Sequence, residues 1–394
     1  MSKRRRFSGS EASFATRAIH GGSAEESLHL ETSFEFASAE DARCRFSDPY
    51  GADIYTRWGN PTVRALEGRV AALEGAEDCV ALASGMGAVT GALLGELEAG
   101  QRVLFPRGLY AETRRAAEAF LRRIGVEVDY VDNATFADPA ELRAALKDDT
   151  ALVWIESIAN PTLRVPDIAG CRDAIGNRCL VVDSTFATPF HVRPLAHGAD
   201  LVVHAATKAI GGHGDAVGGL VAGSKARVGH VRALMARTAG ACLSPFNAWL
   251  IERGVRTLSL RAAAMADTAQ FLAERLATDD RIAEVHYPGL AAHPEHDIAA
   301  RQFDRGFGGL VAFEVRGGLV AGERLYDGVE LITRAVSLGD SKTLLTHPAT
   351  TTHASLSAAE REAGGISDGL LRMSVGLEDR MDLWADLDQA LCPD

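Results

Sequence analysis

Short apolar runs alternate with segments of helical spacing through the middle of the chain. The runs predict strands at residues 79–83, 103–105, 126–131, 152–155, 180–182, 201–203 and 220–222. Residues 110–124 and 138–147 have helical spacing, and the second segment begins with an Asp cap followed by a proline. Strands that alternate with helices indicate an α/β fold, in which helices cover both faces of a mainly parallel sheet.

The pattern differs on either side of this region. Residues 1–55 are polar and irregular, which predicts an extended arm that contacts a partner elsewhere. Residues 56–250 form the predicted α/β domain. A helix that begins near Leu243 has apolar positions that continue through Leu258, Leu260 and Phe271 to Leu276, long enough to bridge two domains. Residues 251–394 mix strands at 310–313 and 370–375 with helices near Ile298, Leu325 and Leu383, so a smaller α+β C-terminal domain is expected.

Composition narrows the class of protein. The 394 residues are 47% hydrophobic, enough for a large core, and the formal net charge of -12 disfavours a nucleic-acid partner. The basic residues 3–6 are not followed by an apolar segment, so export is not expected, and the uncharged residues 79–95 do not form a membrane span. Six cysteines without a C-x-x-C pair indicate buried thiols in a cytoplasmic protein.

The segment around Lys208 carries the strongest chemical signal. An apolar strand ends in Thr207-Lys208, and a glycine-rich turn follows. A lysine just beyond a buried strand is partly desolvated, so its amine holds a proton less tightly and becomes a nucleophile for an aldehyde. This property is what a Schiff base with pyridoxal phosphate requires. A surface lysine at the start of a solvated helix is the alternative.

Residues 84–88, Ser-Gly-Met-Gly-Ala, follow a predicted strand and begin a helix. The free N–H groups and the positive end of that helix would bind an anion such as a phosphate. A dinucleotide-binding fold is the alternative, because the glycines from Gly85 to Gly91 partly match its motif. Such a fold expects an acidic residue at the end of the next strand, where this chain has Pro106-Arg107, so we favour a phosphate site of another kind.

Two charged residues lie in predicted strands. Asp183 ends a buried strand, where an ionised carboxylate is costly unless it meets a cation such as the protonated nitrogen of pyridoxal phosphate. A helix N-cap, with Ser184 and Thr185 as further cap formers, or a metal ligand is the alternative. Arg372 interrupts an apolar strand, where an amino-acid carboxylate would compensate its burial. A structural salt bridge is the other interpretation of Arg372.

The histidines do not indicate a metal site. Three pairs lie close together in the sequence, and none has supporting Cys, His or Asp residues at metal spacing: His293 with His296, His347 with His353, and His204 with His213. Polar packing and turn roles are expected for them, and no bound metal.

Longer motifs resemble one known family. They are residues 54–62 (Ile-Tyr-Thr-Arg-Trp-Gly-Asn-Pro-Thr), 83–86 (Ala-Ser-Gly-Met), 156–161 (Glu-Ser-Ile-Ala-Asn-Pro), 182–189, 204–208 and 337–340. Almost end to end, the chain resembles the pyridoxal-phosphate-dependent enzymes of Cys/Met metabolism, which include cystathionine γ-synthase, cystathionine lyases, methionine γ-lyase and homoserine-ester sulfhydrylases. Residues 237–249 look most like those of O-succinylhomoserine sulfhydrylase. The resemblance implies the transferase-like fold of aspartate aminotransferase, fold type I.

The resemblance also implies roles for matched residues. Lys208 would bind the cofactor covalently and transfer protons, Asp183 would pair with the pyridine nitrogen, and Tyr110 would stack on the ring. Further cofactor contacts are implied for Gly85, Met86, Thr185 and Thr207, and for Tyr55 and Arg57 reaching from a neighbouring subunit. Asn160, Ser337 and Arg372 would bind the substrate carboxylate or the hydroxyl side of the cofactor. A dimer would then be the smallest active unit, and a homotetramer is the expected assembly.

Three positions depart from the family pattern. Ala205 stands where the family usually has a serine, so one hydrogen bond to the phosphate is missing. Glu112 stands near the position where methionine-cleaving lyases carry a cysteine, and its carboxylate would repel a succinyl tail. Lys342 replaces a glutamate common in cystathionine-handling members, and its charge would attract such a tail. Glu112 and Lys342 could also neutralise each other.

The predicted activity is γ-replacement on an O-acylhomoserine, with O-succinylhomoserine as the expected ester and sulfide or a thiol as the nucleophile. The protein would be a transferase of methionine biosynthesis. A lyase that carries out γ-elimination on cystathionine or methionine is the alternative, and a non-catalytic relative of the fold is a third. No nucleic-acid or membrane partner is expected. The acyl group and the sulfur donor remain open.

Overall fold

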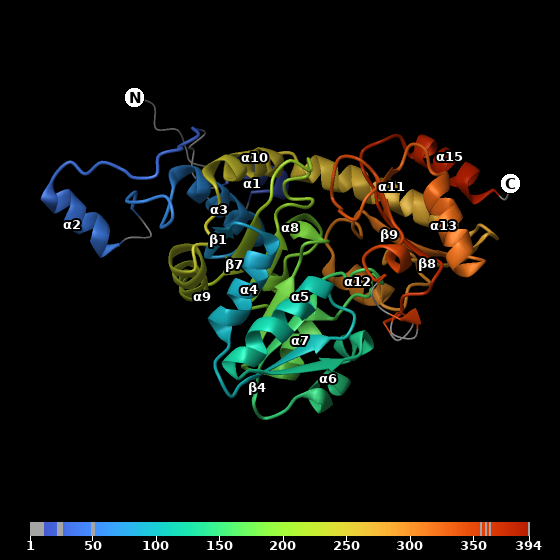
Figure 1. Ribbon diagram of the computed structural model, residues 1–394, viewed down its shortest axis with the longest axis horizontal. Helices are drawn as coiled ribbons and strands as arrows, with labels where there is room; N and C mark the ends of the chain where they lie inside the picture. The colour runs from blue at the N-terminus through green and yellow to red at the C-terminus, as the bar shows by residue number, and fades with distance from the viewer. Residues whose placement is uncertain are drawn as a thin grey trace.

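The protein has a large domain, a smaller C-terminal domain and an N-terminal arm (Figure 1). The computed structural model describes residues 12–21, 27–48, 52–354, 357–358, 361 and 364–392. The basic residues 3–6 lie outside these ranges. Within the described ranges, no helix combines the length and the apolar character needed to cross a membrane.

A seven-stranded sheet forms the centre of the large domain, in the order β1-β7-β6-β5-β4-β2-β3. Its strands are β1 (Asp78–Leu82), β2 (Arg102–Pro106), β3 (Glu127–Val131), β4 (Thr150–Glu156), β5 (Cys179–Asp183), β6 (Leu201–Ala205) and β7 (Gly219–Gly223). Only β7 runs antiparallel to its neighbours, β1 and β6. The predicted strands and the mainly parallel sheet are therefore confirmed.

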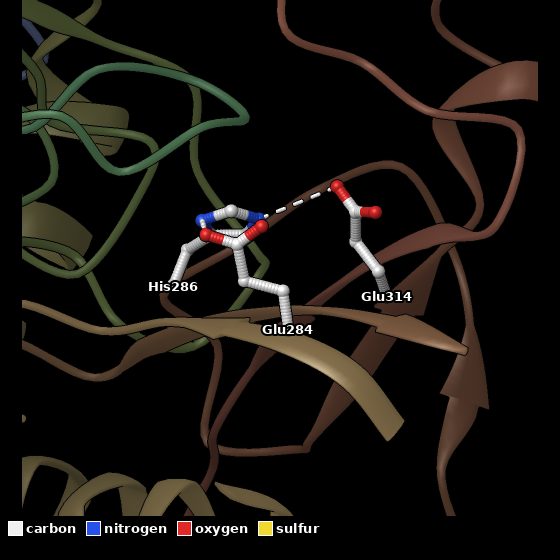
Figure 2. Close-up of side chains that lie close together, drawn as sticks. All are labelled: Glu284, His286 and Glu314. Atoms are coloured by element: carbon white, nitrogen blue, oxygen red, sulfur yellow. Dashed lines mark ion pairs between the residues drawn. The ribbon is translucent and has the colours of Figure 1, made fainter. Parts of the chain in front are cut away.

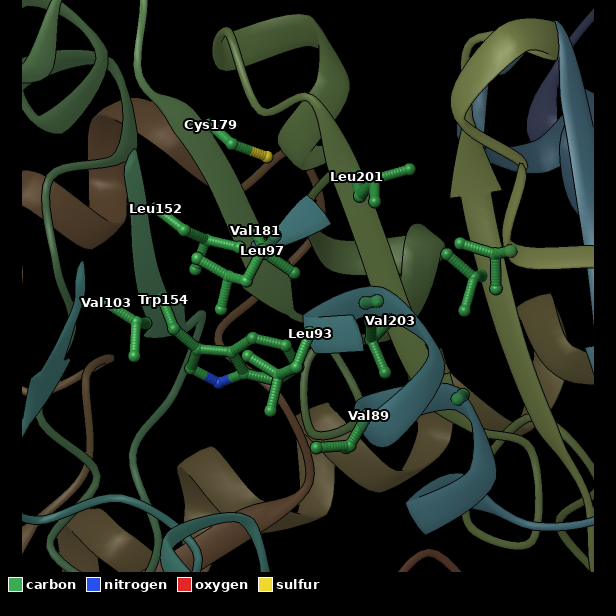
Figure 3. Close-up of a cluster of buried hydrophobic side chains, with 14 of the residues drawn as sticks. Val89, Leu93, Leu97, Val103, Leu152, Trp154, Cys179, Val181, Leu201 and Val203 are labelled. Carbon is green, nitrogen blue, oxygen red and sulfur yellow. The ribbon is translucent and has the colours of Figure 1, made fainter. Parts of the chain in front are cut away.

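Helices cover both faces of this sheet because successive strand residues point to opposite sides. The helices are α3 (Pro61–Glu74), α4 (Gly85–Glu96), α5 (Ala111–Ala116), α6 (Pro139–Ala145), α7 (Ile168–Ile175), α8 (Thr188–His191) and α9 (Lys225–Val231). Val181 packs in the cluster on the α4 face, and its neighbour Val182 packs in the cluster that contains residues of α6 and α7. Figure 3 shows Val89 and Leu93 of α4 lying over Trp154 and the strands.

Both helices predicted in this domain are present. The segment 110–124 begins as α5 and continues as a π-helical turn (Ala117–Leu121) and a 3-10 turn (Arg122–Ile124). The segment 138–147 contains α6, and the Asp138 side chain accepts hydrogen bonds from the N–H groups of Ala140 and Glu141. Further short helical segments are the 3-10 helices Asn133–Ala137, Pro194–His197 and Pro348–Thr350 and the π-helix Arg232–Thr238.

The prediction of one continuous bridging helix is wrong, because this segment forms two helices. α10 (Pro245–Val255) and α11 (Leu258–Ala277) are separated at Arg256 and Thr257. The apolar spacing also predicted that Leu260 faces the core, but Leu260 is 73% exposed and Arg261 beside it is buried. α11 extends from the large domain into the smaller one (Figure 1).

The C-terminal domain is built on a five-stranded sheet in the order β10-β11-β12-β9-β8. Its strands are β8 (Ile282–His286), β9 (Leu310–Val315), β10 (Thr333–Arg334), β11 (Leu344–Thr346) and β12 (Leu370–Ser374), and its helices are α12 (His296–Gln302), α13 (Gly318–Gly328) and α15 (Arg380–Leu391). The strands expected at 310–313 and 370–375 and the helices expected near Ile298, Leu325 and Leu383 are all present.

The N-terminal arm contains α1 (Phe14–His20) and α2 (Ala39–Ser47). α1 packs on α3, whereas α2 has no buried residue and extends away from both domains (Figure 1). The rings of Phe36, Phe46 and Trp58 contact one another in sequence along the arm, and Phe36 and Phe46 remain 40% and 52% exposed. Exposed aromatic side chains of this kind are typical of an interaction surface.

Candidate active site

The main cavity lies where strands β4, β5 and β6 end. Its volume is about 520 Å³, and strand ends are the usual position of ligands in α/β sheets. Of the residues predicted from the sequence, those in its wall are Gly85, Met86, Tyr110, Asn160, Asp183, Thr185, Thr207, Lys208, Ser337 and Arg372. The fold thus brings residues from both domains around one cavity.

Lys208 follows β6 and points its amine into this cavity. Its backbone N–H donates to the carbonyl of Ala205 at 3.0 Å, and its Nζ donates to Ser337 Oγ at 3.0 Å. Burial and, to a smaller extent, the nearby charge of Arg372 lower the pKa of Lys208. A lowered pKa increases the fraction of free amine, which is the nucleophilic form.

Asp183 ends β5 in the wall of the cavity. Its Oδ1 accepts hydrogen bonds from the N–H of Thr185 at 3.0 Å and from Thr185 Oγ1 at 2.6 Å. Burial raises the pKa of Asp183 above its usual range. α8 begins only at Thr188, so Asp183 does not cap it, and no Lys or Arg of the described ranges forms an ion pair with its carboxylate. A cationic ring nitrogen would compensate that charge.

The N-terminus of α4 forms another part of the wall. Ser84 caps the helix by accepting a hydrogen bond from the N–H of Gly87 at 3.0 Å. A Cβ at position 85 would lie 2.6 Å from the Cβ of Ala205, so only glycine fits beside β6. The N–H groups at the start of this helix have no partner within it and suit a phosphate.

Arg372 on β12 is a buried cation without a carboxylate partner among the described residues. It is 3% exposed and donates to Asn160 Oδ1 at 2.6 Å and to the hydroxyl of Thr346 at 3.3 Å. Within the described part of the chain, its Nε has no hydrogen-bond partner. Burial lowers the pKa of Arg372 to about 10, so the side chain remains charged at neutral pH. The structural salt bridge considered from the sequence is not found there, and the guanidinium is free to receive an anion.

Glu156, which belongs to the sequence motif 156–161 but is not among the predicted site residues, also lies in the cavity wall. Its carboxyl group accepts hydrogen bonds from the N–H groups of Tyr110 at 2.7 Å and Asn160 at 3.2 Å. Burial, together with the charge of Asp183, raises the pKa of Glu156 to about 8. Glu156 therefore fixes the positions of two other residues of the site.

His353 was assigned a packing role from the sequence, but it also lies in the wall of the cavity, beside Thr352. Its Nδ1 is 2.9 Å from Thr352 Oγ1. Burial, and then the charges of Arg372 and Arg361, lower the pKa of His353. The only signal in the sequence was its position in the segment that follows the matched family motifs.

Four predicted site residues are not in the cavity wall of the single chain. The Arg57 guanidinium donates to the carbonyl of Arg237 and lies 5.4 Å from the centre of the Tyr55 ring. Glu112 pairs with Arg115 at 2.8 Å, not with Lys342, so the two departures from the family pattern do not neutralise each other directly. Lys342 is exposed.

Pyridoxal phosphate needs an amine, an acid and an anion-binding helix end within reach of one cavity, and this chain provides all three. The class defined by the fold and the cavity is therefore that of the pyridoxal-phosphate-dependent enzymes. The family model for the Cys/Met metabolism PLP-dependent enzymes matches residues 14–392, and the chain belongs to this family. Its cofactor is pyridoxal 5'-phosphate.

Relatives with different activities match over nearly the whole chain. An L-methionine gamma-lyase of Pseudomonas putida is 43% identical, covering 96% of this chain and 97% of the relative. An O-succinylhomoserine sulfhydrylase of Pseudomonas aeruginosa is 41% identical, covering 96% and 95%. The crystal structure of metB from Corynebacterium glutamicum has a TM-score of 0.89 at 37% identity and covers 97% of this chain and 98% of its own. The fold and the cofactor are thereby confirmed, and the reaction within the family is open.

Proposed function

We propose that this enzyme catalyses γ-replacement on an O-acylhomoserine, with O-succinylhomoserine as the preferred ester and sulfide or a thiol as the nucleophile. The observation that carries the proposal is the buried Arg372, which has no carboxylate partner among the described residues and lies in the same cavity as Lys208. An α-carboxylate bound there would hold an amino acid next to the lysine amine. The likeness to an O-succinylhomoserine sulfhydrylase supports the choice of ester.

Each residue has a defined task in this proposal. When bound, pyridoxal phosphate supplies an electron sink for the negative charge that develops at the substrate α-carbon. Lys208 removes and returns protons with an amine whose pKa is lowered by burial. Asp183 provides the buried negative charge that favours a protonated ring nitrogen. Arg372 and Asn160 orient the carboxylate of the substrate.

The phosphate and the ring would be held by further residues. The phosphate would be bound by the backbone of Gly85 and Met86 at the start of α4 and by Thr185 and Thr207, and the ring would stack on Tyr110. Ala205 leaves this end of the cavity without one hydroxyl group. A site with several phosphate contacts would tolerate that loss, because a single charge-assisted hydrogen bond contributes roughly 1.5–3 kcal/mol.

γ-Elimination is the second candidate function, because relatives named as methionine gamma-lyases reach 43% identity over nearly the full length. The same residues serve both reactions, and the outcome depends on whether water or a sulfur nucleophile captures the substrate. Glu112 argued against a succinyl group, but its carboxylate pairs with Arg115 and is not in the cavity wall. Glu112 therefore disfavours a succinyl group less than the sequence suggested.

We also propose that the arm, residues 1–55, completes the cavity of a second copy, while residues 56–250 and 251–394 supply the rest. Tyr55 and Arg57 are not in the wall of their own chain's cavity, and the exposed aromatic side chains of the arm suit a protein contact. A dimer would then be the smallest active unit and a homotetramer the assembly.

A substrate panel tests the reaction. O-succinylhomoserine, O-acetylhomoserine, cystathionine and methionine are each supplied with and without sulfide, and homocysteine and 2-oxobutanoate are measured. We expect homocysteine from O-succinylhomoserine, in amounts that depend on sulfide and exceed those of 2-oxobutanoate. Cleavage of methionine with a higher kcat/KM than that of the ester would instead establish the lyase.

A further inference from the structure

A second polar cluster lies on the C-terminal sheet, outside the main cavity. It consists of Glu284 and His286 on β8 and Glu314 on the adjacent β9, shown in Figure 2. One donor atom from each side chain lies within 4.8 Å of the other two. Glu284 and Glu314 are direct partners in the antiparallel register, and His286 lies two residues beyond Glu284, so all three point from the same face of the sheet.

Two carboxylates opposite each other on adjacent strands repel unless a cation lies between them. Among the described residues, neither glutamate forms an ion pair with a lysine or an arginine, and His286 is the only basic partner of both. The cluster therefore combines negative charge with a nitrogen donor.

The contacts between the His286 ring and the two carboxylates are longer than hydrogen bonds. His286 Nε2 is 3.5 Å from Glu314 Oε1, and Nδ1 is 3.7 Å from Glu284 Oε1. Both exceed the usual 2.7–3.2 Å of an N–H···O bond, and His286 Nε2 has no hydrogen-bond partner. Ligands around a tetrahedral zinc ion, each about 2.0–2.2 Å from the metal, are separated by roughly 3.3 Å. One ion binds only one imidazole nitrogen, so an ion on Nε2 beside Glu314 requires Glu284 to turn toward it from Nδ1. The side chain of Glu284 is 62% exposed and has room to do so.

The cluster borders a second cavity, of about 200 Å³, between the two domains. Glu284 and His286 line it together with His293, whose side chain is only 1% exposed and whose Nε2 has no hydrogen-bond partner. Burial lowers the pKa of His293 to about 4, so this imidazole adds no positive charge at neutral pH. Three protein ligands at the edge of a cavity leave a coordination position for water or a small anion.

We propose that Glu284, His286 and Glu314 bind a divalent transition metal ion, of which Zn²⁺ is the representative. Two carboxylate oxygens and one imidazole nitrogen form a ligand set suited to ions of this class. The ion replaces the missing cation between the two glutamates. The site is separate from the cavity that contains Lys208, so its occupancy does not depend on the reaction proposed for the enzyme.

Zinc titration of the cofactor-loaded protein tests the site. The titration is done in a Cys44→Ser/Cys392→Ser background, because these two exposed thiols would bind zinc themselves. We expect one zinc equivalent by calorimetry, weakened at least about tenfold in His286→Ala and in Glu314→Gln, since each variant removes a ligand. His230→Ala and Glu323→Gln change exposed residues outside the cluster and should bind zinc as the parent does.

Two outcomes would overturn the assignment. One is an unchanged zinc affinity and stoichiometry in both cluster variants, with their cofactor absorbance intact. The other is an anomalous difference peak, in zinc-soaked crystals of the parent, that lies away from Glu284, His286 and Glu314. A peak between these three side chains supports the proposal even where a variant folds poorly.

Discussion

At the scale of single residues, the site depends on charges that are buried without an ion-pair partner among the described residues. Arg372 is 3% exposed, and its hydrogen bonds go to neutral groups, including Asn160. Among the described residues, the carboxylate of Asp183 accepts hydrogen bonds only from Thr185. An isolated buried charge destabilises the folded state, so residues of this kind are kept where a ligand supplies the opposite charge.

Replacing Lys208 with alanine should abolish turnover and the visible absorbance of the bound cofactor. In the proposed mechanism, this amine both binds the cofactor covalently and transfers protons. Steady-state assays and absorbance spectra of the purified variant measure both effects. Lys225→Ala is the matched control, because Lys225 is an exposed lysine at the start of α9. Substantial activity in the Lys208→Ala variant would contradict the assignment.

Glu156 predicts a pH dependence of stability in the cofactor-free protein. Its pKa is raised from an ordinary 4.5 to about 8, mainly by burial, so the folded state retains a proton that the unfolded chain releases. Its contribution to stability is fully present below pH 4.5 and is lost as the pH rises through about 8.

Glu156→Gln should remove this pH dependence, since the amide does not titrate. Urea unfolding of both proteins between about pH 6 and pH 9 gives the free energy of unfolding, with a slope of at most about 1.4 kcal/mol per pH unit for one proton. Equal slopes for the two proteins would show that Glu156 is already ionised in the folded state.

The sequence identified the residues whose chemistry is visible locally, and it missed those whose role depends on contacts between segments that are distant in the sequence. Lys208, Asp183 and Arg372 each follow or interrupt an apolar strand, which marks them as charges in a buried position. Glu156 also ends an apolar strand, but its bonds to Tyr110 and Asn160 join segments that are distant in the sequence. The Glu284, His286 and Glu314 cluster was missed because it arises from the pairing of β8 with β9.

At the scale of elements, the junction of α10 and α11 supports the turn that follows Lys208. Arg261 of α11 is buried, and its guanidinium donates to the carbonyls of Ala209 and Ile210 in that turn and of Gly254 in α10. The periodicity of the sequence could not show this junction, because apolar residues continue at helical spacing across Arg256 and Thr257. The strands were easier to predict, since each is a short apolar run between polar turns.

Gly254→Ala should destabilise the protein and weaken cofactor binding. A Cβ at position 254 would overlap the backbone carbonyl of Gly211, and a backbone atom cannot rotate away. Overpacking of this kind costs about 1–3 kcal/mol, more than the helix propensity that alanine gains. Thermal unfolding and cofactor titration measure the two effects.

Gly229→Ala in α9 is the matched control for this helix substitution. A Cβ there has no atom within 4 Å, so the variant should be as stable as the parent or more stable by roughly 0.5–1 kcal/mol. If Gly254→Ala were equally well tolerated, the close contact between α10 and the Lys208 turn would not constrain the site.

At the scale of the whole molecule, the two domains of one chain line the cavity, while α2 of the arm extends away from both domains (Figure 1). Lys208 and Arg372 line the same cavity of one chain although they belong to different domains. Tyr55 and Arg57 lie outside that wall, and the ring of Trp58, which follows Arg57, contacts that of the exposed Phe46. Lys208 and Arg372 must therefore act within one chain, whereas Tyr55 and Arg57 can act in a neighbouring one.

Mixed assemblies of two inactive variants test this distinction. If Arg57 completes the cavity of a second copy, co-expression of Arg57→Ala with Lys208→Ala gives mixed dimers in which one site is intact. Random mixing makes half of the dimers mixed, so about a quarter of the parent activity should return. Co-expression of Lys208→Ala with Arg372→Ala should restore nothing, because both residues belong to the cavity of a single chain. If the first mixture is no more active than the two variants expressed separately, Arg57 acts in its own chain's site or takes no part in the reaction.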